Sequence, residues 1–372
     1  MKTFFNLIQE VQKPGLCHRC GGCVTFCSAI NYGALEIDGD GKPRYGDIEK
    51  CIECGLCHAI CPEIGELDQE VRRLASWSEP MGRVIETAIA QSSDPAILDR
   101  ATDGGAVTAI LLHLLERGRI DGAIVTKQVG PFQRAPFLAT SREEIIDAAG
   151  FFFDTSHGMP ALGEHYMTCA SITEFDPMVK NRLNRVALVG TPCQIQSVRR
   201  MQAMDLVPAD SIKFCLGLFC AGNFIFGDSQ RSKLADMGGF SWENVRKVNI
   251  KENLQLHMTS GEKKTIALED LYAIRRHACR FCTDYAAEYA DISFGGIGAA
   301  EGWTTVMTRT PLGRAAMADA VSAGAMVKAL YEDDTNISTH ANKQVQTLSE
   351  KKKAGAHRQR RKLDKRPVVI RD

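Results

Sequence analysis

Short apolar runs bounded by polar or glycine-rich segments recur through the middle of the chain. Residues 186–189 are wholly apolar, residues 212–220 are interrupted only by Lys213, and residues 291–294 contain Ile292 and Phe294. Short apolar runs of this kind are typical of strands buried on both faces of a sheet. Residues 106–116 and 195–201 instead repeat apolar positions with a helical period. This alternation predicts a mixed fold, α+β or α/β, with parallel strands at its centre.

The pattern changes between residues 245 and 268. Short alternating runs occupy residues 248–251, 254–258 and 265–268, and Ser260 with Gly261 forms a turn signal between the last two. We interpret this stretch as a small antiparallel hairpin region, either a lid or a subdomain.

The C-terminal stretch is polar and basic. From Ala341 to Asp372 it contains eleven Lys or Arg against three Asp or Glu. We interpret it as a basic helical tail, either solvated, which we favour, or a docking arm for a partner subunit. A chain of 372 residues is too long for one ordinary domain, and we predict three units at residues 1–78, 83–333 and 334–372.

Composition narrows the class of protein. The formal net charge is zero, which gives no argument for a nucleic-acid partner. The first 15 residues lack the apolar segment of a signal peptide, and no window approaches 18 uninterrupted apolar residues. These features predict a cytoplasmic protein without direct membrane insertion. Eight of the 14 cysteines fall between Cys17 and Cys61, so metal binding is a better interpretation than disulfides.

Those eight cysteines form two copies of the spacing C-x2-C-x2-C-x3-C, which is typical of bacterial two-cluster ferredoxins. In such proteins the fourth cysteine of each run binds the other cluster. We therefore predict two 4Fe-4S clusters, with a pair of zinc sites as the alternative. The predicted ligands are Cys17, Cys20, Cys23 and Cys61 for the first cluster and Cys51, Cys54, Cys57 and Cys27 for the second.

A third metal site is predicted from cysteines that lie far apart in the sequence. Cys193 follows the strand at 186–189 and opens the next helix, where the helix end stabilises a thiolate. Cys220 ends another strand, and Cys279 and Cys282 form a lone C-x2-C that needs two more ligands. The four together predict a third 4Fe-4S cluster, with zinc as the alternative.

The remaining cysteines are predicted to be buried thiols. They are Cys169 and Cys215, and Cys215 should point to the opposite face of its strand from the cluster ligands.

The glycine and aromatic motifs alone do not identify a cofactor. Gly104 and Gly105 open the helix at 106–116, where they could cradle a phosphate or serve as a plain helix cap. The three phenylalanines at 151–153 are either core or cofactor wall. The glycines after residue 294 do not continue as G-x-G-x-x-G because residue 301 is Glu, so the Rossmann dinucleotide signature is missing.

Over residues 85 to 330 the chain resembles the family of coenzyme F420 hydrogenase and dehydrogenase beta subunits. The resemblance lies in Gly190 to Gln194, Cys220, the C-x2-C at 279–282, the glycines after residue 290 and the Gly104–Gly105 helix start. The fused ferredoxin resembles the input subunit of F420H2 dehydrogenase most. The resemblance implies FAD, the third cluster on Cys193, Cys220, Cys279 and Cys282, and hydride exchange between FAD and coenzyme F420, a 5-deazaflavin. It places FAD contacts at Gly104, Gly105, Thr191, Gln194 and Asn223.

Two departures from the family pattern bear on the substrate. Phe152 and Phe153 stand where the family usually has lysine and tyrosine, and Gly296 stands where it often has aspartate. The first departure removes a cation from a pocket expected to hold a phosphorylated, polyanionic coenzyme.

The hypothesis is an iron–sulfur flavoprotein oxidoreductase that connects coenzyme F420 to a larger redox complex. A hydrogenase, a formate dehydrogenase, a heterodisulfide-reductase-like complex or membrane dehydrogenase subunits are the expected partners. The alternatives are an electron-relay subunit without F420 activity and a flavoenzyme that uses NAD(P)H or ferredoxin. Hydride transfer needs alignment more than proton transfer, and no residue is predicted to be a catalytic acid or base.

Overall fold

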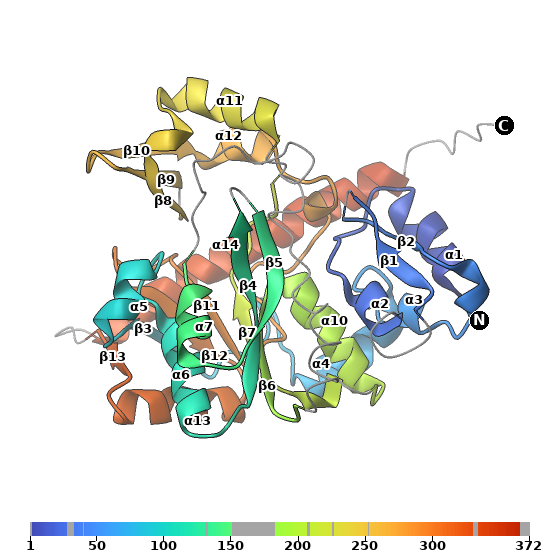
Figure 1. Ribbon diagram of the computed structural model, residues 1–372, viewed down its shortest axis with the longest axis horizontal. Coiled ribbons are helices and arrows are strands. Elements are labelled where there is room, and N and C mark those ends of the chain that lie inside the picture. Colours follow the sequence, from blue (N-terminus) through green and yellow to red (C-terminus); the bar gives the residue numbers. More distant parts are fainter. Residues whose placement is uncertain are drawn as a thin grey trace.

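A computed structural model describes residues 2–27, 33–39, 41–130, 133–150, 183–206, 209–224, 227–251, 253–329 and 334–364. Figure 1 shows three groups of elements: a large sheet with its helices, a small antiparallel unit above it, and a compact N-terminal unit beside it. A long C-terminal helix, α14 (Asp334–Asp364), runs from the large sheet toward the N-terminal unit.

The large sheet has eight strands with a parallel centre. In spatial order they are β13 (Met326–Lys328), β3 (Glu86–Ser92), β12 (Thr304–Thr308), β11 (Ile292–Gly295), β7 (Ile212–Leu218), β6 (Val186–Gly190), β4 (Gly122–Gly130) and β5 (Gln133–Ala139). β11, β7, β6 and β4 pair in parallel, whereas the outer strands pair antiparallel. The predicted parallel arrangement of the strands at 186–189 and 212–220 is confirmed.

Helices cover both faces of this sheet. Alternate residues of β7 belong to different cores: Leu216 packs with α6 (Ala106–Glu116) and α13 (Pro311–Ser322), and Cys215 packs with α10 (Pro192–Ala203) on the other face. α14 packs on β3, through Ala341 against Ile89. Of two shorter helices, α7 (Arg142–Asp147) packs against α6, and α5 (Pro95–Arg100) packs against α7 and β3. The large sheet and the helices on its two faces therefore form a three-layer α/β unit.

The small antiparallel unit has its own core. It contains β8 (Val245–Ile250), β9 (Asn253–Met258), β10 (Lys263–Ala267), α11 (Asp228–Gly238), α12 (Leu268–Ala273) and the 3-10 turn Trp242–Asn244. The strands pair antiparallel in the order β10-β9-β8. Buried Val248, Leu256 and Ile266 alternate with more exposed neighbours along these strands, which is why period-two patterning predicted the region.

The N-terminal unit is built from two similar halves. Its elements are α1 (Phe4–Leu7), a π-helical turn (Ile8–Gln12), α2 (Gly22–Thr25), β1 (Leu35–Ile37), β2 (Pro43–Tyr45), a 3-10 turn (Ile48–Lys50) and α3 (Leu56–Ala59). α4 (Asp68–Leu74), preceded by the 3-10 turn Gly65–Leu67, connects it to the sheet. Ahead of α2 and α3, matching residues take a positive φ: Arg19 and Glu53 at 54°, Gly21 at 85° and Gly55 at 76°. The two cysteine runs therefore form two loops with the same backbone conformation.

Helix α14 is less solvated than its composition predicted. Ala341, Val345, Ser349 and Ala356 are almost fully buried, and they recur at intervals of four or seven residues along one side of the helix. Within the described ranges no helix is both long enough and apolar enough to cross a membrane.

Candidate functional site: one cavity and three cysteine sets

A cavity of about 870 Å³ lies where the four parallel strands end. Its walls include Thr126 of β4, Gly190 of β6, Leu218 of β7 and Gly295 of β11, together with residues of α12 and α14. Open parallel sheets bind their ligands at this edge, outside the carboxyl ends of the strands. Position and size both mark it as the candidate cofactor site.

The residues predicted to contact FAD divide into two groups. Those that line the cavity are Gly105, Thr191, Gln194 and Asn223. Gly104 is packed between strands instead: its N–H donates to Oγ1 of Thr304 at 2.9 Å, and a Cβ there would lie 2.6 Å from the carbonyl oxygen of Ala90. Packing accounts for Gly104, and the cofactor contacts of the other four stay predictions.

Cys193 is held at the cavity edge by a helix cap. Thr191 is the N-cap of α10 and forms a capping box with Gln194, whose Oε1 accepts from the Thr191 N–H at 2.9 Å. This arrangement satisfies backbone groups at the helix start. The Thr191 hydroxyl lies 3.3 Å from the Cys193 sulfur, so the β6–α10 turn fixes the thiol.

Three separate segments bring the third cysteine set together. The set comprises Cys193, Cys220, Cys279 and Cys282. Burial raises the pKa of Cys282 to about 11, and the charges of Cys220 and Cys279 add to the effect. Burial also raises the pKa of Cys193, with contributions from Cys282 and Cys220. Cys193, Cys220 and Cys282 therefore lie within electrostatic range of one another, and Cys279 lies within range of Cys220 and Cys282.

Each predicted ferredoxin set surrounds its own small enclosed cavity. Cys17, Cys20, Cys23 and Cys61 line one, and Cys27, Cys51, Cys54 and Cys57 line the other. Burial raises the pKa of the Cys20 thiol to about 11 and that of Cys57 to about 12. Buried thiolates need a compensating positive charge, which cluster iron would supply. Nowhere in the described ranges do three Cys, His, Asp or Glu side chains converge on the position of a single metal ion.

The three sets form a series that begins at the cavity. Cys193 of the third set and Cys20 of the first influence each other electrostatically, and Cys23 of the first set is influenced by Cys57 of the second. Ser197, one turn after Cys193 on α10, lines the small cavity of the first set. A short turn of helix thus connects the large cavity to the N-terminal unit.

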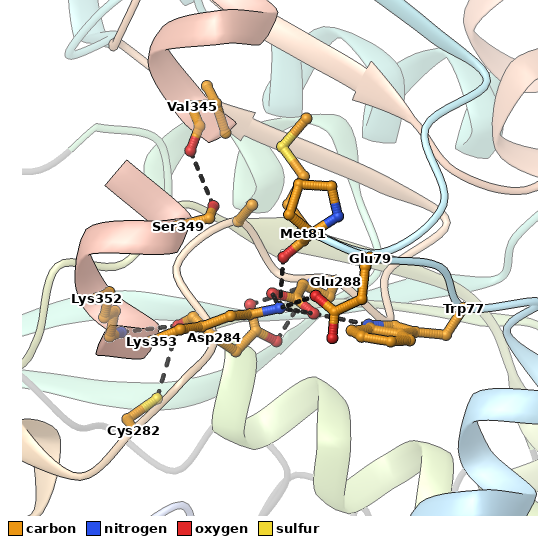
Figure 2. A network of polar contacts seen from close by, with 12 residues as sticks. Trp77, Glu79, Met81, Cys282, Asp284, Glu288, Val345, Ser349, Lys352 and Lys353 are labelled. Carbon is orange, nitrogen blue, oxygen red and sulfur yellow. Dashed lines mark hydrogen bonds and ion pairs between the residues drawn. The ribbon is translucent and has the colours of Figure 1, made fainter. Parts of the chain in front are cut away.

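A polar network ties α14 to the third cysteine set (Figure 2). The ammonium of half-buried Lys352 donates to the carbonyls of Cys220 and Asp284, each at 2.7 Å. Burial opposes its charge, but the thiolates of Cys282 and its neighbours raise the pKa of Lys352 well above its ordinary value. The network therefore places a positive charge beside the third set.

A buried carboxylate occupies the other end of this network. Glu288 accepts from Nε1 of Trp77 at 2.7 Å and pairs with Lys353 of α14 at 3.0 Å. Burial, and then the charge of Asp284, raises the pKa of Glu288 to about 7. Sequence reasoning missed Lys352, Lys353 and Glu288, because nothing local distinguishes them from solvated charges.

Some predictions concern parts of the chain outside the described residues. Cys169 and Phe151–Phe153 lie there. Cys215 is described; it is fully buried among apolar residues that pack on α10, and its N–H donates to Asp291. Cys215 is therefore a structural thiol on the sheet, as predicted.

Comparison with known proteins decides the family. Models of the coenzyme F420 hydrogenase/dehydrogenase beta subunit match residues 87–163 (N-terminal part) and 183–333 (C-terminal part). A coenzyme F420 hydrogenase subunit beta from Methanococcus voltae is 32% identical over 251 residues, which cover 66% of this chain and 85% of the relative. The chain belongs to the family of coenzyme F420 hydrogenase/dehydrogenase beta subunits.

This family member carries an additional N-terminal unit. A 4Fe-4S dicluster model matches residues 9–62, which include all eight cysteines of the first two sets. A subunit of the F420H2 dehydrogenase of Methanosarcina mazei is 25% identical over 323 residues, 82% of each chain. The expected N-terminal ferredoxin unit is confirmed.

A solved relative supports the fold of this beta-type chain. A chain of the F420-reducing NiFe hydrogenase complex from Methanosarcina barkeri aligns with a TM-score of 0.65 and 26% identity. The alignment covers 77% of this chain and 94% of the other. The family models end at residue 333, whereas α14 begins at Asp334.

Proposed function

We propose that this chain is an iron–sulfur flavoprotein subunit that exchanges hydride between coenzyme F420 and FAD and passes single electrons through three 4Fe-4S clusters to a partner oxidoreductase. One observation supports this proposal most: a large cavity at the parallel strand ends has Cys220 of the third cysteine set in its wall, with Cys193 between the lining residues Thr191 and Gln194, and two further sets follow in series. Family membership supplies the coenzyme as the candidate substrate.

The cavity fits a flavin. Its volume of about 870 Å³ lies at the upper end of the range for cofactor pockets. Leu111, Phe294 and Tyr285 give it apolar surface for stacked rings, while Thr191 and Asn223 offer polar groups. FAD bound there would couple two-electron hydride transfer to one-electron transfer.

The protein's contribution is to position and insulate the redox groups. The capping box at Thr191 holds Cys193 next to the cavity, Cys220 lines the cavity, and Cys279 lies within electrostatic range of Cys220. α10 then brings the first set within electrostatic range. Electrons would move from the cavity to the third cluster, then the first, then the second.

The second cluster is the predicted exit. Its cavity is lined by Ile52 and Glu53 as well as by its four cysteines, and Ile52 and Ile48 are 55% and 60% exposed. An exposed apolar edge beside a terminal cluster suits contact with a partner protein. The named relatives are subunits of a hydrogenase and a dehydrogenase, and we propose a comparable larger redox complex as the partner here.

The test is an anaerobic reduction of the reconstituted protein. F420H2 and NADH are added separately, and flavin bleaching is followed in the visible spectrum. The proposal predicts rapid bleaching by F420H2 and none by NADH. Bleaching by NADH alone would contradict it, and bleaching by neither donor, with FAD and iron present, would favour the electron-relay alternative.

A further inference from the structure

Helix α14 forms one wall of the cofactor cavity although it lies beyond the family models. Those models end at residue 333, and the helix begins at the next residue. Its cavity-lining residues are His340, Lys343, Gln344, Thr347, Leu348 and Lys351. They recur every three or four residues, so one helix face is presented to the cavity.

The opposite side of α14 is fixed to the protein, so the cavity face cannot rotate away. Ala341 packs so tightly on Gly298 that a Cβ at this glycine would lie 2.6 Å from the Ala341 Cα. Asn342 donates to Thr87 of β3 at 3.0 Å. Further along, Lys352 and Lys353 enter the network of Figure 2. The cavity face is therefore preorganised.

Two ammonium groups on this face carry charge that is not neutralised. Among the described residues, no carboxylate lies within ion-pair distance of Lys343 or Lys351. In contrast, Lys251 in the same cavity is paired with Asp103 at 3.2 Å. Glu269 also lines the cavity, from α12. Lys343 and Lys351 are eight residues apart, which separates their Cα atoms by about 12 Å along the wall.

We infer that Lys343 and Lys351 bind the anionic tail of the deazaflavin coenzyme, which extends beyond the reacting ring and carries phosphate and carboxylate groups. This inference rests on the proposed function. A separation of about 12 Å suits charges spread along an extended tail better than one compact diphosphate.

The test compares two ligands on two proteins. Oxidised F420, and a 5-deazaflavin without the phosphate and carboxylate tail, are titrated anaerobically into FAD-loaded wild type and into the double variant Lys343→Ala/Lys351→Ala. We expect the variant to bind F420 about tenfold more weakly, since two exposed charge contacts are lost. Its affinity for the tail-less ligand should not change. The matched control is Arg361→Ala/Lys362→Ala, which removes two exposed charges from the last turn of the same helix.

The possible results separate the inference from the proposed function. If wild type binds F420 and the double variant binds it equally well, the inference is wrong and the proposed function stands. An equal loss for both ligands, or a loss of FAD from the variant, would assign the lysines to the ring or to FAD instead. If wild type does not bind F420, both the inference and the proposed function are wrong. Lys343→Arg/Lys351→Arg should retain affinity, which guards against a structural effect of the alanines.

Discussion

The N-terminal unit and the sheet unit collect cysteines in opposite ways. The first two sets come from two short runs, and the same backbone turn with a positive φ is repeated at Arg19 and Glu53. The third set comes from three segments separated by up to 89 residues, Cys193 to Cys282, held at the ends of strands and helices. The first kind of site depends on local spacing, and the second depends on the whole sheet being folded.

The largest expected effect separates the two kinds of site. Cys279→Ala should cost about four irons per chain and leave both ferredoxin clusters, because the predicted ligands of those clusters all come from the two N-terminal cysteine runs. Cys54→Ala should instead remove iron from the N-terminal unit alone. Iron content and electron paramagnetic resonance of the reduced proteins check both variants. Unchanged iron in Cys279→Ala would show that the third set holds no cluster.

The next effect concerns stability against pH. Glu288 has its pKa raised to about 7 by burial, so the folded protein retains a proton that the unfolded chain has released. Stability should therefore fall as pH rises from about 4.5 to about 7, by up to about 3 kcal/mol. Glu288→Gln should remove this fall.

Glu10 in the N-terminal unit is the natural control for Glu288. Hydrogen bonds from Lys2 and His58 lower its pKa, so its contribution has the opposite sign and is lost as pH falls. Anaerobic thermal unfolding at pH 5.5 and 7.5 compares Glu288→Gln with Glu10→Gln. The same pH slope in Glu288→Gln as in wild type would refute the role given to this carboxylate.

A smaller effect is expected at Lys352, the half-buried cation beside the third set. Lys352→Met removes a positive charge that stabilises the reduced cluster by about 2 kcal/mol. For a one-electron reduction this energy corresponds to roughly 100 mV. The potential of the third cluster should fall while the ferredoxin potentials stay within error. A redox titration followed by electron paramagnetic resonance measures this. Equal shifts in all three clusters would point to a general structural change.

The smallest effect tests whether sheet stability and iron binding are separable. Thr310 caps α13 by accepting from the Gly313 N–H at 3.0 Å, far in sequence from every cysteine. Thr310→Ala should cost about 1 kcal/mol of stability with no loss of iron. Chemical denaturation and iron analysis of the same sample check it, and iron loss would show that the third set depends on this edge of the sheet.

The sequence was sufficient wherever the determinants are local. Ferredoxin spacing, the strand at 186–189, the helix that starts at Pro192 and the antiparallel region all follow from short patterns, and the structure has each of them. The prediction that groups the four cysteines of the third set also rests on local features, because Cys193 and Cys220 follow strand ends and Cys279 and Cys282 form a C-x2-C. The role of α14 could not be predicted: its buried face is only four small or apolar residues in a polar helix, and what they contact is decided by Gly298 and β3.

Gly104 shows the opposite limit. The sequence of a glycine pair at a helix start is compatible with a phosphate site in two cases. The glycine N–H can be free to bind a ligand, or it can already donate to a protein acceptor. Only the folded sheet, with Thr304 on β12 beside it, shows that the Gly104 N–H has a protein acceptor.

The central claim is that the third cysteine set is the required link between the cavity and the N-terminal clusters. The most direct test mixes F420H2 anaerobically with wild type and with Cys279→Ala, and follows flavin and cluster reduction together by stopped-flow absorbance and freeze-quench electron paramagnetic resonance. In wild type both should be reduced. In Cys279→Ala the flavin should bleach while the ferredoxin clusters stay oxidised; reduction of those clusters at the wild-type rate would contradict the account.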